Sequence, residues 1–217
     1  MNELEKTYET VDMLKALDLP ISKAQLDDIE RLEKEYGNVH REDLWLYFYE
    51  KCFANYTKRI MNIKQAKIRG EVIVAKPVLL LAIIDGISND LFRGNEIHLT
   101  DWLEVRYEML MRKYMKNSQF DKPTDVSNPF WHLQTDDFWH LQLIEKQQEG
   151  VTPSKRWLKE KVSYAYFDED LWLLLKDEAW RTKLRDYIIE HKLTDGFWNG
   201  KIAAEGLGLL AALLLAA

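Results

Sequence analysis

The sequence has little cysteine, glycine or proline and no long apolar run, and each shortage excludes a class of protein. A single cysteine among 217 residues excludes a disulfide framework and a cysteine-based zinc or iron–sulfur site. Nine glycines and five prolines are too few for a collagen-like or low-complexity chain. No apolar run reaches the about 20 residues that cross a bilayer, and the N-terminus MNELEKTYET has no apolar signal region. We therefore expect a cytoplasmic protein without a membrane partner.

Acidic residues outnumber basic ones, but the excess belongs to one end of the chain. The formal net charge is −6, and residues 1–50 contain 13 Asp and Glu against 6 Lys and Arg. The remaining residues are balanced, and their basic side chains are clustered, as phosphate binding requires. Solvated helix faces can show the same pattern. The clusters are Lys58, Arg59, Lys64, Lys67, Arg69 and Lys76; then Arg106, Arg112, Lys113 and Lys116; then Lys155, Arg156, Lys159 and Lys161.

The N-terminal part of the chain has the patterns of helices. Ser22 followed by Gln25 is a capping box, and Gly37 with Asn38 should end the helix that begins there. Residues 40–56 favour a second helix. We expect an acidic helical segment over 1–54, a domain over 55–200, and a tail over 201–217. The tail contains mainly Ala and Leu, and a packing helix, a partner-binding segment and a cloning or reading-frame scar all remain open.

The rest of the chain favours an α+β fold that is mostly α. Pro77 precedes VLLLAII at 78–84, for which we expect a buried helix. Residues 95–99 are a short strand candidate, and Thr100 should cap an amphipathic helix. Further helices are expected from Ser154 onward and after the capping residues Asp168 and Asp177.

The tetrapeptide Phe-Trp-His-Leu occurs twice, at 130–133 and 138–141, on either side of a polar turn. Aromatic segments that flank a short polar turn predict a β-hairpin. A three-residue loop would pair His132 with His140, whereas a two-residue loop would not. Neither histidine has a cysteine or an acidic partner at ligand spacing, so we expect no metal site.

Motifs for catalysis and for cofactors are not found in the sequence. A nucleophile elbow, a P-loop and a dinucleotide-binding glycine motif are missing. The E-x-K triplet that metal-dependent nucleases carry on a strand occurs only at 190–192, where a helix is expected to end. Cys52 lies in an aromatic-rich helix and is expected in the core. We therefore expect no catalytic residue and no cofactor in this chain.

Four ordered blocks resemble the sulfur-binding domain of McrA-type HNH restriction endonucleases. They are KPVLLLAIID at 76–85, NEIHLT at 95–100, PFWHLQTDDFWHL at 129–141 and YAYFDEDL at 164–171, and the resemblance covers about residues 55–192. The resemblance implies a domain that binds DNA in which sulfur replaces a non-bridging phosphate oxygen. In that family an apolar pocket built around a proline receives the sulfur, basic side chains hold the neighbouring phosphates, and a separate HNH domain cuts the strand.

Position by position, the resemblance implies that Pro129 supplies the pocket ring and that Lys76 and Trp131 flank it. The basic residues expected to bind DNA with them are Lys64, Lys67, Arg69 and Arg112. The chain departs from the family at three positions, because Ala75 replaces a histidine, Asn128 replaces a frequent tyrosine, and Asp137 replaces a turn glycine. A residue other than glycine disfavours a left-handed turn at that position.

No HNH module follows within the 217 residues. We therefore expect a DNA-binding module without its own nuclease, whose partners are modified double-stranded DNA and a nuclease or other protein. The alternative is an α-rich interaction or regulatory protein that reuses the fold, since fold does not determine function. The acidic N-terminal segment would suit that alternative.

Overall fold

The computed structural model describes residues 2–37, 42–115, 118–144 and 153–193. Helices dominate this part of the chain, and two small antiparallel sheets of two strands each complete it. The expectation of a mostly α fold with a small β component is confirmed. Within the described residues, no helix has both the length and the hydropathy that a membrane span needs.

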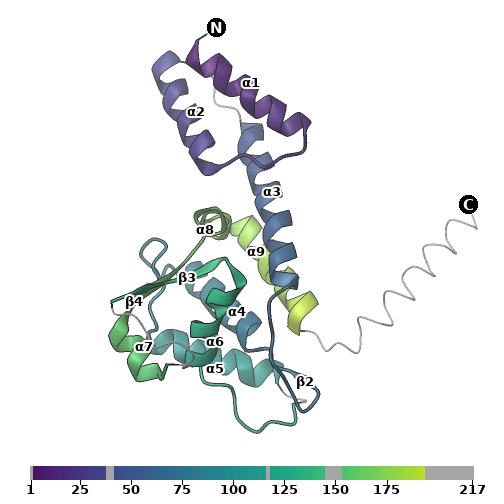
Figure 1. Cartoon of the computed structure of the whole chain (residues 1–217), viewed down its shortest axis with the longest axis vertical. Coiled ribbons are helices and arrows are strands. Elements are labelled where there is room, and N and C mark those ends of the chain that lie inside the picture. Colours follow the sequence, from purple (N-terminus) through teal and green to yellow (C-terminus); the bar gives the residue numbers. More distant parts are fainter. Residues whose placement is uncertain (1, 38–41, 116–117, 145–152, 194–217) are drawn as a thin grey trace, which may run out of the picture.

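Three helices form the N-terminal end of the molecule (Figure 1). Helix α1 is Glu3–Ala16, α2 is Lys23–Tyr36 and α3 is Glu42–Met61. The predicted capping box is present, since the Ser22 side chain accepts from the Gln25 amide and the Gln25 side chain accepts in return. Gly37 ends α2 at φ 71°, in the left-handed region that glycine adopts at low cost. Helix α3 continues through residue 54, so the acidic segment and the following domain share one helix.

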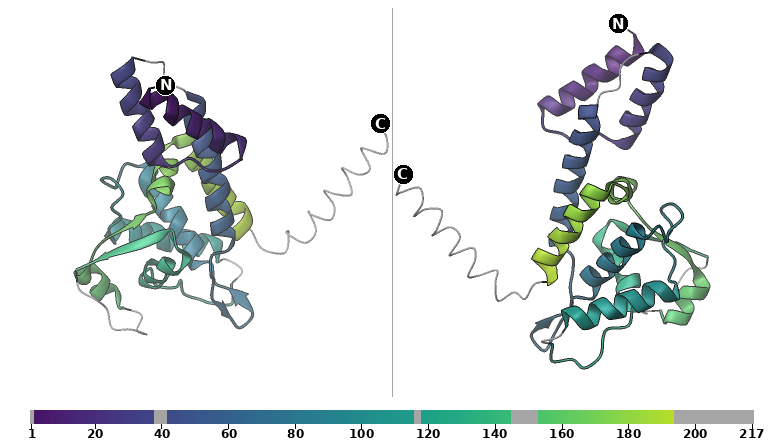
Figure 2. Two further views of the ribbon diagram at one scale, coloured as in Figure 1. Left: turned by 45° about the horizontal axis from the view of Figure 1, so that its top comes forward. Right: turned by 180° about the vertical axis from the view of Figure 1, so that it is seen from behind.

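Helix α4, Ala75–Ser88, lies at the centre of the core and confirms the predicted buried helix. Its residues from Val78 to Ile84 are all buried. Helix α5, Asp101–Tyr114, packs along α4 and is capped by Thr100, whose hydroxyl accepts from the Leu103 amide. Because α4 is apolar on most of its surface, it must be covered on several sides, and α5 and several later helices pack against it (Figure 2).

The predicted hairpin at 130–141 is wrong. The first Phe-Trp-His-Leu copy lies in helix α6, Ser127–His132, and the 3₁₀ turn η1, Leu133–Asp136. Only the second copy is extended, in strand β3, Trp139–Leu143. Two local features favour a helix here. The Asp125 carboxylate forms a turn just before α6, in which it accepts from the Ser127 amide at 2.9 Å and from the Ser127 hydroxyl at 2.6 Å. Pro129 fits a first helical turn because it lacks an N–H.

Strand β3 pairs instead with β4, Val162–Phe167, which was not expected as a strand. Helix α7 begins after its cap Ser154 as predicted, but it covers only Lys155–Lys161. The candidate strand at 95–99 contributes a single bridge, in which Ile97 and Ala165 exchange two backbone hydrogen bonds of 2.7 and 2.8 Å.

Helices α8, Glu169–Lys176, and α9, Glu178–Ile188, pack against α3 and end in the short π-helix η2, Ile189–Leu193. Asp177 caps α9 as predicted, through a bond from the Trp180 amide. Cys52 is buried as expected. The Ala- and Leu-rich tail predicted over 201–217 lies outside the described residues.

Candidate functional site

Lys76 lies in the first turn of α4, at a helix end that no side chain caps. The cap residue Val74 makes no side-chain hydrogen bond to the helix, and the first turn contains no acidic residue. The amide dipoles of a helix sum to a partial positive charge at its N-terminus, which favours an anion there. The ammonium of Lys76 adds a full charge beside this end of the helix.

One carboxylate fixes the position of the Lys76 side chain. The Lys76 Nζ atom lies 2.6 Å from Asp136 Oδ2 and 3.1 Å from Thr135 Oγ1, and the side chains of Lys76 and Asp136 are 11% and 3% exposed. The other oxygen of Asp136 accepts from the Lys64 amide at 2.9 Å. An ammonium has three N–H donors, so one remains for a ligand. Nothing in the sequence marks Asp136 as the partner of Lys76, because the two residues are 60 positions apart.

Helix α6 lies against the same end of α4. His132 is half-buried there, and its pKa is lowered by burial and then by the positive charge of the nearby Lys76, both of which favour the neutral ring. Pro129 is buried and Asn128 is exposed. Trp131 is half-buried, and its ring meets Trp157 edge to face at 6.0 Å. Because Pro129 is buried, its ring does not project from the surface of α6.

The basic residues of the first cluster continue from this point onto a small hairpin. Strands β1, Lys67–Ile68, and β2, Glu71–Val72, pair through a turn in which Arg69 has φ 49° and Gly70 has φ 88°. Two successive positive φ angles define the type I′ turn that suits a two-residue hairpin. Lys64, Lys67 and Arg69 are exposed. This hairpin was not expected from the sequence, in which Gly70 at the second turn position is the one turn signal.

Arg112 is not joined to this group by any contact among the described residues. It is exposed on α5 and forms an ion pair with Glu108 at 2.6 Å. The third basic cluster is largely compensated by acids, because Lys155 pairs with Glu104 at 2.9 Å and Lys159 pairs with Glu104 at 2.6 Å. Of the predicted basic residues, the structure brings Lys76 and Lys64 together through Asp136 and places Lys67 and Arg69 on the neighbouring hairpin.

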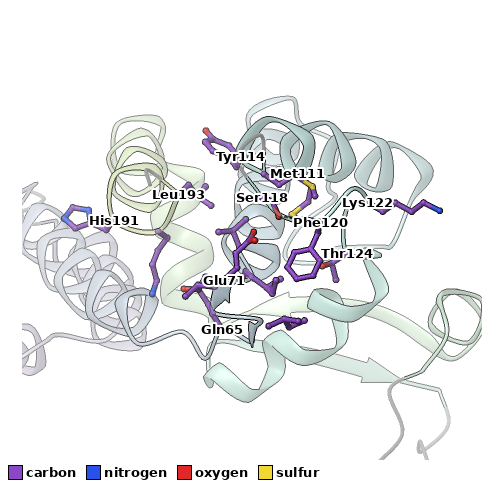
Figure 3. A pocket seen from close by; sticks show the side chains of 16 residues that line it. Gln65, Glu71, Met111, Tyr114, Ser118, Phe120, Lys122, Thr124, His191 and Leu193 are labelled. Carbon is purple, nitrogen blue, oxygen red and sulfur yellow. Dashed lines mark hydrogen bonds between the residues drawn. The ribbon is translucent and has the colours of Figure 1, made fainter. Parts of the chain in front are cut away.

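A pocket of about 540 Å³ opens between the β1–β2 hairpin, the end of α5 and η2 (Figure 3). In Figure 3 Glu71 lies near its middle, with Phe120 and Thr124 on one side and Leu193 on the other. The carboxylate of Glu71 accepts from the Gln119 amide at 3.1 Å. The pocket therefore adjoins the basic hairpin, but neither Lys76 nor Pro129 lines it.

A second polar centre, which the sequence did not indicate, forms around Asp168. Its Oδ2 accepts from Arg59 Nη1 at 2.7 Å and from the Tyr56 hydroxyl at 3.1 Å, and its Oδ1 lies 2.7 Å from His140 Nε2. Arg59 also donates to the Asp137 carbonyl. Asp168 was expected only as a helix cap, and its side chain makes no capping bond to α8. The cluster joins α3, the start of β3 and the start of α8.

Within the described ranges, no group of three or more His, Cys, Asp or Glu side chains is arranged to hold a metal ion. His132 and His140 are not paired as a hairpin with a three-residue loop would pair them, since His132 lies beside Lys76 and His140 contacts Asp168. The E-x-K triplet at 190–192 is in η2, a helical context.

The sequence and the structure of this chain are similar to those of known proteins. The sulfur-binding domain of ScoMcrA complexed with phosphorothioated DNA is similar, at 20% identity and a TM-score of 0.46, and the match covers 65% of this chain and 90% of that chain. A structure of the sulfur-binding and SRA domains of ScoMcrA complexed with phosphorothioated DNA is also similar, at 24% identity and a TM-score of 0.45. That match covers 57% of this chain and 37% of that chain. No curated protein matches. The model of the ScoMcrA-like DNA sulfur-binding domain matches residues 54–207, most of the sequence. The chain belongs to the ScoMcrA-like DNA sulfur-binding domain family.

Proposed function

We propose that this protein binds double-stranded DNA in which a sulfur atom replaces a non-bridging oxygen of one backbone phosphate. The match of residues 54–207 to the family carries the proposal. The contact face consists of the start of α4, helix α6 with η1, and the β1–β2 hairpin. We call these three segments the binding face.

The charges of the binding face suit the phosphates that flank the modified one. Lys64, Lys67 and Arg69 are exposed, and no ion pair joins them to another described side chain. Each phosphate contact releases condensed counterions, so these side chains supply affinity that depends on salt but not on sequence. Lys76 is held at the positive end of α4 with one N–H unused, which suits an oxygen of the modified phosphate or of its neighbour.

The preference for sulfur has a different physical basis. Sulfur is larger and less strongly hydrated than oxygen, so an apolar notch favours it, whereas an oxygen placed there loses water without compensation. In this proposal Pro129 forms the floor of the notch and Trp131 forms one side. A nuclease or another protein that acts on the bound strand is the proposed partner of this binding face.

The direct test uses one duplex, with and without a single phosphorothioate, in a gel-shift assay at two salt concentrations. The sulfur duplex should bind more tightly at both, while higher salt should weaken both duplexes in parallel. Pro129→Ala should reduce the preference for sulfur more than the overall affinity, and Pro20→Ala, at an exposed proline far from α6, is the matched control.

Equal affinity for the two duplexes would overturn sulfur recognition and leave a generic basic surface. If Pro129→Ala lowers the affinities for the modified and the unmodified duplex by the same factor, with the fold intact by circular dichroism, then Pro129 does not contribute to sulfur recognition. Binding to neither duplex would favour the alternative, an interaction protein that reuses the fold.

A further inference from the structure

Four rings form a row along the outer face of the β3–β4 sheet and the segment beside it. His140 is the register partner of Tyr166, and Gln142 is the partner of Tyr164 on the same face. The ring centroids lie 5.1 Å apart for His140 and Tyr166, 6.0 Å for Tyr166 and Tyr164, and 6.2 Å for Tyr164 and His98. All four side chains reach solvent in part. We call them the ring row.

The ring row ends at a pocket of about 280 Å³. His98 and Tyr164 line this pocket, and the His98 side chain is 54% exposed. The most deeply buried lining residues are Ile97 at 0% exposure and Phe130 and Leu158 at 1% each. The volume is just below the about 300–1,000 Å³ of sites for drug-sized ligands, so the pocket suits one small ring system.

The walls of this pocket are effectively neutral. Lys159 lines it, but the Lys159 ammonium is 2.9 Å from Asp101 Oδ1 and 2.6 Å from Glu104 Oε1, so its charge is compensated. A phosphate would find no free cation among the lining residues that the structure describes. The lining combines aliphatic and polar groups, and with an aromatic ring at the mouth it favours a flat, uncharged, aromatic group.

The pocket lies next to the binding face. Phe130, which lines it, follows Pro129 directly in α6, and Trp131 of the same helix contacts Trp157 of α7. Helix α7 leads into β4, which carries Tyr164 and Tyr166. A DNA strand held at α6 would therefore pass close to the mouth of the pocket.

We propose that this pocket receives one unpaired nucleobase of the bound DNA, with Tyr164 as its stacking surface. The inference rests on the proposed DNA binding and adds a second point of recognition to it. Sheets that present aromatic rings bind bases by stacking, which tolerates any sequence because every base has a π face. Taking a base out of the duplex costs free energy, and that cost is least when the base is already unpaired.

The experiment compares a fully paired duplex with a duplex that carries a single-nucleotide bulge of 2-aminopurine near the modified phosphate. Each is prepared with and without the phosphorothioate. The bulged DNA should bind more tightly, and its fluorescence should fall on binding because the base stacks on a ring. Tyr164→Ala should weaken binding of the bulged DNA roughly 5- to 150-fold and abolish the quench, whereas Tyr164→Phe should retain both. Tyr36→Ala, at an exposed tyrosine of α2, is the matched control.

If the bulged DNA binds no more tightly than the paired duplex, base recognition at this pocket is overturned. The same holds if the tighter binding and the fall in fluorescence both persist in Tyr164→Ala. That result is separate from the test of sulfur binding, because preference for the phosphorothioate is measured on the fully paired duplex. Conversely, a quench that depends on Tyr164 in unmodified bulged DNA would support the pocket even without sulfur preference.

Discussion

Asp137 shows how one residue can accept an unfavourable conformation. It has φ 61° at the turn between η1 and β3, although the sequence disfavoured a left-handed turn without glycine. Asp is among the few residues that visit this region readily, because its short side chain can bond locally. The turn directs the Asp137 carbonyl toward Arg59.

We expect substitutions at Asp137 to report the cost of this backbone conformation. Its side chain is exposed, so few other interactions change. Asp137→Gly should change the free energy of unfolding by less than about 1 kcal/mol, whereas Asp137→Val should lower it by about 1–2 kcal/mol. Urea denaturation measures both, and a valine variant as stable as the original protein would contradict this account.

At the scale of elements, the Asp168 cluster joins three segments that are far apart in the sequence. Burial by itself would raise the pKa of Asp168, but hydrogen bonds from His140 and Arg59 and the charge of Arg59 outweigh it, so the pKa is lowered. A carboxyl whose pKa is lower in the folded state stabilises the fold above its unfolded pKa of about 3.9. That stabilisation is lost as the pH falls through the folded pKa.

Asp168→Asn should therefore reduce the free energy of unfolding at pH 7 by about 2 kcal/mol, because it removes an ionised acceptor from three donors. The difference between variant and original should shrink as the pH falls below about 4. Urea denaturation across this pH range measures it, with the exposed Asp121→Asn as control. A difference that stays constant down to about pH 3 would exclude Asp168 ionisation as the cause.

At the scale of the whole molecule, acidic and basic regions occupy opposite ends of one helix. Helices α1 and α2 lie beside the N-terminal half of α3, and the basic cluster follows its C-terminal end (Figure 1). The 20 residues of α3 span about 30 Å. Charges at that separation interact at about 0.01 M salt, where the Debye length is about 30 Å, but are screened at about 0.15 M, where it is about 8 Å.

Removing acidic charge from the N-terminal end should therefore change DNA binding only at low salt. The double variant Glu9→Gln, Glu30→Gln should raise the association rate roughly twofold at about 0.01 M salt and leave it unchanged at about 0.15 M. Stopped-flow fluorescence with labelled duplex measures both. A gain that persists at the higher salt would indicate direct contact between α1 or α2 and the DNA.

Local signals in the sequence determined most helix starts and the buried helix. Three residues cap the helices that they were predicted to cap: Ser22, Thr100 and Asp177. Such caps are readable from sequence because a cap bonds to an amide two or three residues away. Of the candidate site, only the positively charged residues could be predicted from the sequence. Lys76 and the exposed basic residues could be identified, but not the partner that holds Lys76 in place.

Only the tertiary structure decided the rest. The two Phe-Trp-His-Leu copies take different conformations although their sequences are identical, since β4 offers a pairing edge only to the second. Asp136 contacts Lys76, which is 60 positions away in the sequence, and Asp168 contacts Arg59, which is 109 positions away. Such contacts form where packing brings distant segments together, so no short-range pattern encodes them. Capping and apolar periodicity act within a few residues, which is why the sequence alone could determine those.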